Sequence, residues 1–228
     1  MKNDFYIVEN YITKDNFDKI FNENLGDHDN FSVTFNANLV DNEYSMQFRK
    51  EFDTIKFDDI YQYRNDTIES ISQVWFTRPL HFFNSDWPLK EKITSWVSKN
   101  YNIPKDKLGV THTQIQIYPP GSHIEAHSDK SYDDEDDKIC AILIPLNSMP
   151  ENASGGLLVG RKKTKKRTIK FEEDMTYTKT PVYQTIFEYR PKRGDMVVVD
   201  FNSEATHEVT PVVNWFRFML TCFIKKLD

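Results

Sequence analysis

The stretch YPPGSHIEAHSDKS, residues 118–131, decides how the fold of the chain is interpreted. It places two histidines and an aspartate directly after a Pro-Pro-Gly turn. His127 and Asp129 are two residues apart, and side chains two apart on a β-strand point to the same side of the sheet. The spacing therefore predicts that both side chains reach one point, where they could hold a metal ion. His123 is interpreted as a loop or pocket-rim residue.

A third metal ligand has to come from elsewhere in the chain, and His207 is the best candidate. It lies in FNSEATHEVTPVV, residues 201–213, where it opens another predicted strand. Two histidines and one carboxylate form the ligand set of non-haem Fe(II) oxygenases, which leaves coordination positions open for reactants. A His-x-Asp pair alone is weak evidence, because the polar end of a strand gives the same pattern.

Arg217 adds an independent observation. It follows His207 by ten residues, inside the otherwise apolar segment WFRFMLTCF, residues 215–223. A guanidinium is costly to bury unless an anion meets it. A turn at residues 212–214 would bring Arg217 back toward the metal ligands, and arginine binds carboxylates with two parallel hydrogen bonds. A carboxylate ligand beside the metal is therefore predicted.

From about residue 110, the chain consists of short β segments separated by turns. We expect strands within residues 111–118, 138–147, 155–160, 181–189, 194–201, 206–213 and 215–224. Seven or eight strands at this spacing predict a sandwich or a barrel. Residues 162–179 are too many for a hairpin loop and are predicted to be an insertion that projects from the fold.

The first hundred residues mix helical and extended patterns. Apolar residues at helical spacing predict a helix after Thr13, over residues 17–25, and another over residues 89–97. Between them, alternating apolar residues predict a strand at residues 31–35. These elements are interpreted as scaffold that supports the β-rich half.

Charge and composition limit the classes of partner. The chain carries 29 basic and 35 acidic residues, a net charge of −6, so any nucleic-acid contact must be local. The basic run at residues 161–167 is interpreted as an exposed loop screened by the acidic residues after it, and nucleic acid is not an expected partner. The acidic run at residues 133–137 is interpreted as a solvated loop.

The N-terminus carries charges where a signal peptide needs an apolar segment. The longest apolar run is too short to span a bilayer. We therefore expect a soluble, cytoplasmic protein with no membrane partner. Cys140 and Cys222 lie in apolar runs and are predicted to be buried thiols.

Taken in order, these residues resemble the Fe(II)- and 2-oxoglutarate-dependent dioxygenases, specifically the prolyl 4-hydroxylase-like branch. The resemblance covers residues 112–224, about half of the chain. Its positions are Gln114, Tyr118, Gly121, His127, Asp129, ILIPLN (residues 142–147), Gly155–Gly156, Gly194–Asp195, His207-Glu208-Val209 and Arg217.

The resemblance implies a mainly β (α+β) fold with a double-stranded β-helix, or jelly-roll and cupin-like, core. It implies one domain, residues 1–228, in which residues 1–108 support a catalytic core at residues 109–228, with an inserted hairpin at about residues 161–180. Iron would be held by His127, Asp129 and His207. The 2-oxoglutarate carboxylate would meet Arg217, with further contacts from Tyr118 and Gln114.

The implied activity is hydroxylation of a C–H bond in a peptidyl residue such as proline, coupled to decarboxylation of 2-oxoglutarate to succinate. Fe(II), 2-oxoglutarate and O2 would be required, with ascorbate as an optional further cofactor. Alternatives are the same chemistry on a free amino acid or another small metabolite, a zinc or manganese hydrolase or isomerase, and a binding module without catalysis. The carboxylate of Asp129 argues against halogenating relatives, which have a small residue there. Relatives that demethylate nucleic acids carry a further arginine, whereas only Lys225 and Lys226 follow Arg217.

Overall fold

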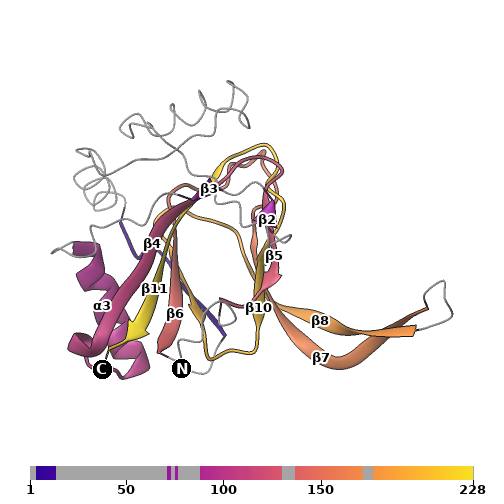
Figure 1. The fold of residues 1–228 in the computed structure, drawn as a ribbon. Coiled ribbons are helices and arrows are strands. Elements are labelled where there is room, and N and C mark those ends of the chain that lie inside the picture. The colour runs from indigo at the N-terminus through magenta and orange to yellow at the C-terminus, as the bar shows by residue number, and fades with distance from the viewer. Residues whose placement is uncertain are drawn as a thin grey trace.

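The computed structural model describes residues 4–13, 71–72, 75–76, 88–129, 137–171 and 177–227. The helix predicted at residues 17–25 and the strand predicted at residues 31–35 lie outside these residues. The described strands form two facing sheets, with one long hairpin that extends away from them (Figure 1). The strands are β1 (Phe5–Val8), β2 (Ile71–Ser72), β3 (Trp75–Phe76), β4 (Leu108–Tyr118), β5 (His123–His127), β6 (Lys138–Pro145), β7 (Leu158–Phe171), β8 (Tyr177–Tyr189), β9 (Met196–Asp200), β10 (Thr206–Val209) and β11 (Arg217–Lys226).

The path of the chain defines the fold. One sheet has the order β1-β9-β6-β11-β4-β3, and the other has the order β2-β5-β10-β7-β8. From β4 onward, the chain passes repeatedly from one sheet to the other, and every pairing of neighbouring strands is antiparallel. This alternation is the topology of a double-stranded β-helix, so the predicted fold class is confirmed.

Helix α3 (Pro88–Tyr101) packs on the outer face of the six-stranded sheet. Proline is favoured at the first helical position because its missing N–H would have no partner there. Leu89, Ile93 and Val97 follow at helical spacing and are completely buried, which confirms the predicted helix. Cys140 and Cys222 are free, buried thiols in the same apolar layer, as the sequence predicts.

Strand β11 separates two apolar layers. Phe218 and Leu220 belong to the layer beneath α3, whereas Met219 belongs to the layer between the two sheets. Because side chains alternate along a strand, Arg217 lies on the same side as Met219, facing the space between the sheets. The alternation of the strand therefore directs the charged residue inward.

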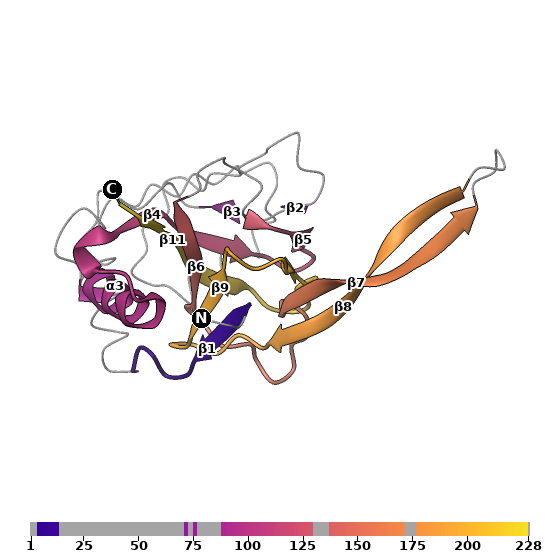
Figure 2. The ribbon, with the colours of Figure 1, turned by 90° about the horizontal axis from the view of Figure 1, so that it is seen from below.

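The start of β7 and the end of β8 belong to the five-stranded sheet, and the rest of the two strands extends away from it. Leu158 and Val159 are buried, but the residues from Lys165 to Lys170 are exposed. Both perpendicular views show the outer part of this hairpin extending well beyond the sheets (Figure 1, Figure 2). Among the described residues, no helix has the length and apolar character needed to cross a membrane.

Candidate active site

Two strands of the five-stranded sheet bring the two predicted histidine ligands together. His127 is the last residue of β5, and His207 lies on β10 directly opposite it. Their ring centroids are 4.4 Å apart. Beyond a register shift, Val209 pairs with Ile124, and both side chains are buried in the apolar core between the sheets.

Asp129 completes the group, but it does so from beyond the strand. One carboxylate oxygen lies 3.4 Å from Nε2 of His127, and the other lies 3.5 Å from Nε2 of His207. The expectation that Asp129 shares a strand with His127 is wrong, because β5 ends at His127. The chain turns after the strand, and this turn carries the carboxylate toward both rings.

The donor set fits a metal ion. The candidate ligand atoms of His127, Asp129 and His207 all lie within 4.8 Å of one another. Bonds of about 2.1 Å would place neighbouring ligand atoms about 3 Å apart, close to the observed spacing. Nδ1 of His127 lies 2.8 Å from the carbonyl oxygen of Glu125, so a hydrogen on Nδ1 donates to this carbonyl. Such a bond orients the ring and leaves Nε2 as the metal-binding nitrogen.

The pKa values of the three groups reflect their burial and mutual contact. Burial, reinforced by the neighbouring His127, lowers the pKa of His207 to about 4 despite the opposing charge of Asp129. Burial also acts to lower the pKa of His127, but hydrogen bonding and attraction to Asp129 outweigh it and raise this pKa. Burial acts to raise the pKa of Asp129, and the two histidines reverse this and lower it. His207 and Asp129 therefore stay in the deprotonated forms that bind metal at neutral pH.

Arg217 is a buried charged residue at the start of β11. Its side chain is only 1% exposed, and it is the direct partner of Tyr118 across β11 and β4. The guanidinium carbon lies 4.4 Å from the centre of the Tyr118 ring. Within the described part of the chain, neither Nε nor Nη1 of Arg217 has a hydrogen-bond partner. A buried cation with unused donors is costly, so the site fits an anionic ligand.

Burial lowers the pKa of Arg217, while Tyr118 and Tyr189 act in the opposite direction. Tyr118 also interacts electrostatically with Asp129, so the same tyrosine acts on the arginine and on one candidate metal ligand. The Tyr118 hydroxyl donates to Oε1 of Gln116 at 2.7 Å.

Two loops hold Arg217 in place. Asn147, just after β6, donates to the carbonyl of Phe216 at 2.7 Å and accepts from the amide of Phe218 at 3.0 Å. Gly156 has φ +64°, and a Cβ at this position would lie 3.3 Å from Cδ of Arg217. The Leu-Asn pair that follows β6 belongs to the family pattern, but the sequence alone does not predict a role for Asn147.

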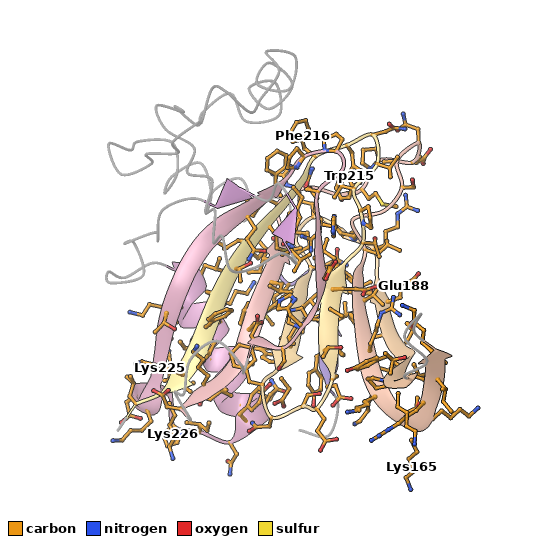
Figure 3. The ribbon with its side chains drawn as sticks, turned by 45° about the vertical axis from the view of Figure 1, so that its right-hand side comes forward. Lys165, Glu188, Trp215, Phe216, Lys225 and Lys226 are labelled. Atoms are coloured by element: carbon orange, nitrogen blue, oxygen red, sulfur yellow. The ribbon has the colours of Figure 1, made fainter. Side chains whose placement is uncertain are left out.

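The remaining predicted residues have varied outcomes. His123 pairs with Ser72 and is not one of the three residues that converge at the metal site, as expected. Gln114 pairs with Thr221 in the sheet, but its side chain lies outside the described part of the structure. Trp215 is buried and donates through Nε1 to the carbonyl of Ser154 at 3.3 Å; Figure 3 shows it at the loop before β11.

Comparisons with known proteins agree with this site. The model of the 2OG-Fe(II) oxygenase superfamily matches residues 113–225, about half of the chain, and this range contains all the predicted ligands. The chain is a member of this superfamily. The sequence matches none of the curated proteins with which it was compared.

Solved structures of this superfamily share the fold. A Pseudomonas putida prolyl-4-hydroxylase has a TM-score of 0.54 and 14% identity, covering 100% of this chain and 95% of its own. A prolyl hydroxylase from Trichoplax adhaerens has a TM-score of 0.53 and 14% identity, and the match covers 99% of this chain and 84% of the Trichoplax chain. The viral collagen prolyl hydroxylase of Paramecium Bursaria Chlorella virus-1 has a TM-score of 0.50 and 13% identity, and the match covers 99% of this chain and 91% of the viral chain. At this identity, the likeness establishes the double-stranded β-helix.

Membership in the superfamily makes the protein an oxygenase that uses Fe(II), 2-oxoglutarate and O2. His127, Asp129 and His207 could bind the iron. The expectations about the enzyme class and about Fe(II), 2-oxoglutarate and O2 are therefore confirmed.

Proposed function

We propose that His127, Asp129 and His207 hold the iron and that Arg217, assisted by Tyr118, binds a carboxylate of 2-oxoglutarate. The observation that carries this proposal is the buried guanidinium of Arg217, which has unused donors and faces the space between the sheets, together with the three converging ligands. A 2-oxoglutarate molecule has a carboxylate at each end, so one end can meet Arg217 while the other reaches the metal.

Each residue would have a defined task. The histidine rings and the Asp129 carboxylate leave one side of the metal site open, since three ligands occupy only half of an octahedron. Bound iron would supply the activation of O2 that the protein's own side chains cannot perform. Arg217 and Tyr118 would orient the co-substrate, and the apolar residues around them, such as Met219 and Val212, would exclude water.

For the substrate, we propose a peptidyl residue, with proline as the first candidate. Two considerations support this class. The side chains of His127 and Asp129 are 17% and 14% exposed, so the candidate metal ligands are not sealed inside the core and a substrate group can reach them from solvent. The Trichoplax adhaerens structure of similar fold is described as a complex with a peptide fragment of the hypoxia inducible factor oxygen degradation domain.

The cofactor roles are tested by an anaerobic absorption titration. Fe(II) followed by 2-oxoglutarate should give a visible charge-transfer band that requires both additions. The band should be absent in His127→Ala and should need much more 2-oxoglutarate in Arg217→Ala. A folded, iron-loaded wild-type protein without this band would contradict the proposed roles.

The substrate class needs a separate test. Wild-type enzyme with iron and 2-oxoglutarate should be offered proline-containing peptides and, in parallel, free amino acids. We expect succinate release coupled to a mass gain of one oxygen atom only with peptides. Oxidation confined to a free amino acid would replace the peptidyl hypothesis with the small-metabolite alternative.

A further inference from the structure

The outer part of the β7–β8 hairpin has no role in the site described above. We call residues 161–171 and 177–187 the arm. Residues 161–187 contain eight lysines and arginines and three acidic residues, a net charge of +5. The whole chain has a net charge of −6, so the rest carries −11. The arm is therefore a concentrated positive region on an acidic protein.

The base of the arm is neutralised, but its middle is not. Arg161 forms an ion pair with Glu208, and Lys162 lies 3.7 Å from a carboxylate oxygen of Asp4. No described residue forms an ion pair with Lys163, Lys165, Lys166 or Arg167. Like charges held close together repel one another, so this cluster does not serve the stability of the hairpin.

Positive charge lies on both faces of the arm. Lys163 pairs with Tyr183, and Ile169 pairs with Lys179, so these residues share one face. Lys162 directly precedes Lys163, and Lys170 directly follows Ile169, so both lie on the opposite face. Tyr183 is 42% exposed and Ile169 is 57% exposed, which places apolar surface among the cations.

The length of the arm is also unusual. β7 has 14 residues and β8 has 13, whereas an average strand has about five or six. A two-stranded ribbon that projects into solvent gains little from packing. Figure 2 shows that its outer half has none of the two sheets beside it. We therefore infer from its shape and charge that the arm binds a partner molecule.

We propose that the arm binds the phosphate backbone of a nucleic acid. A two-stranded β-ribbon fits the major groove of B-DNA, where phosphates flank it on both sides. Cations on both faces suit this arrangement, whereas an acidic protein docking on the ribbon would meet one face. The exposed ring of Tyr183 could also stack on an unpaired base. This differs from the expectation of a screened loop, because no described residue pairs with the cations in the middle of the arm.

The arm is connected directly to the candidate active site. At its base, Gly160 pairs with His207, and Arg161 pairs with Thr206. The base of the arm therefore lies next to the strand that carries His207, whereas its outer half extends away from the sheets (Figure 2). The inference concerns binding only and does not depend on iron or on the proposed substrate.

The test is fluorescence anisotropy with the full-length, metal-free protein. The probes are a labelled DNA duplex of about 20 base pairs, roughly two helical turns, the matching RNA duplex, and each single strand. Binding is measured between about 50 and 200 mM salt. Polyglutamate of matched charge is the competitor that represents an acidic protein. Comparison of the probes identifies which nucleic acid is bound.

The informative variant is Lys165→Gln/Lys166→Gln, and the matched control is Lys99→Gln/Lys226→Gln. All four lysines are exposed, and both changes remove two charges. Lys226 lies at the end of β11, on the side of the molecule away from Lys165 (Figure 3). Thermal unfolding of both variants should match that of wild type, since none of these side chains is buried.

We expect the logarithm of the wild-type binding constant to fall linearly with the logarithm of the salt concentration. The arm variant should bind all sequences of the preferred probe more weakly, with a slope reduced by about 2, while the control variant is unchanged. No binding at the lowest salt, equal loss in both variants, or displacement by polyglutamate as effective as by unlabelled nucleic acid would each overturn the proposal.

Discussion

The guanidinium of Arg217 lies 4.4 Å from the centre of the Tyr118 ring, and the two residues are direct partners in the pairing of β11 with β4. The ring covers one side of the cation, while Nε and Nη1 find no hydrogen-bond partner among the described residues. The aromatic face compensates for part of the lost hydration, but it cannot accept in-plane hydrogen bonds. The arginine is thus held in a position that favours a carboxylate ligand over the ligand-free state.

Replacing Arg217 with methionine should have opposite effects on stability and on binding. Without 2-oxoglutarate, the free energy of unfolding should rise or stay unchanged, because an unpaired buried charge is replaced by an apolar chain of similar length. The affinity for 2-oxoglutarate should fall roughly 100-fold, as two charge-assisted hydrogen bonds are lost. Urea denaturation and anaerobic 2-oxoglutarate titration measure the two effects.

Arg190→Met is the matched control for this change. Arg190 is exposed and donates to the carbonyl of Pro150. We expect neither stability nor 2-oxoglutarate affinity to change by more than a few tenths of a kcal/mol. Undiminished 2-oxoglutarate binding by Arg217→Met would show that another group holds the carboxylate.

Metal binding should stabilise the folded chain through Asp129. An ion that binds only the native state at 100 times its Kd adds about 2.7 kcal/mol to the free energy of unfolding. We expect anaerobic Fe(II) to raise the melting temperature of wild type and of His123→Ala, because His123 is not among the converging ligands. Asp129→Ala should lose most of this rise. A rise that persists in Asp129→Ala but disappears in His123→Ala would assign the site to different residues.

Much of the candidate site could be predicted from the sequence because the signals lie within short segments. His207 stands at the start of a predicted strand, and Arg217 is a charged residue inside an apolar strand, where burial of its charge is costly without an anion. The role of Asn147 could not be predicted, because its hydrogen bonds to Phe216 and Phe218 join residues that are distant in the chain. The position of Asp129 beyond β5 was missed for a similar reason, since a strand end has no strong local signal there.

The arm shows a different limit of sequence analysis. Alternating apolar residues predict strands because one face is buried. From Lys165 to Lys170, both faces of β7 are exposed, so this alternation is absent although these residues belong to a strand. The extension of β7 to Phe171 and the start of β8 at Tyr177 could therefore be seen only in the structure.

Asn147 should act as a positioning residue for Arg217. Asn147→Ala removes the hydrogen bonds of its side chain to the Phe216 carbonyl and the Phe218 amide and should lower the free energy of unfolding by about 1–3 kcal/mol. It should also weaken 2-oxoglutarate binding roughly fivefold, as β11 loosens at Arg217. Asn202→Ala is the control, since the side chain of Asn202 is exposed. Loss of stability with fully retained 2-oxoglutarate affinity would limit Asn147 to a structural role.

Gly155 should tolerate alanine far less well than Gly121 does, although both have positive φ values of 68° and 89°. A Cβ at Gly155 would lie 1.7 Å from the carbonyl oxygen of Pro211, whereas a Cβ at Gly121 would meet nothing within 4 Å. Gly121→Ala should therefore cost only the left-handed backbone conformation, about 1–2 kcal/mol. Gly155→Ala adds displacement of the loop before Arg217, a further 1–3 kcal/mol or so. Urea denaturation compares the two, and 2-oxoglutarate titration should show weaker binding for Gly155→Ala alone. Equal losses of stability would mean that the loop at Pro211 can move freely, in which case it does not fix the position of Arg217.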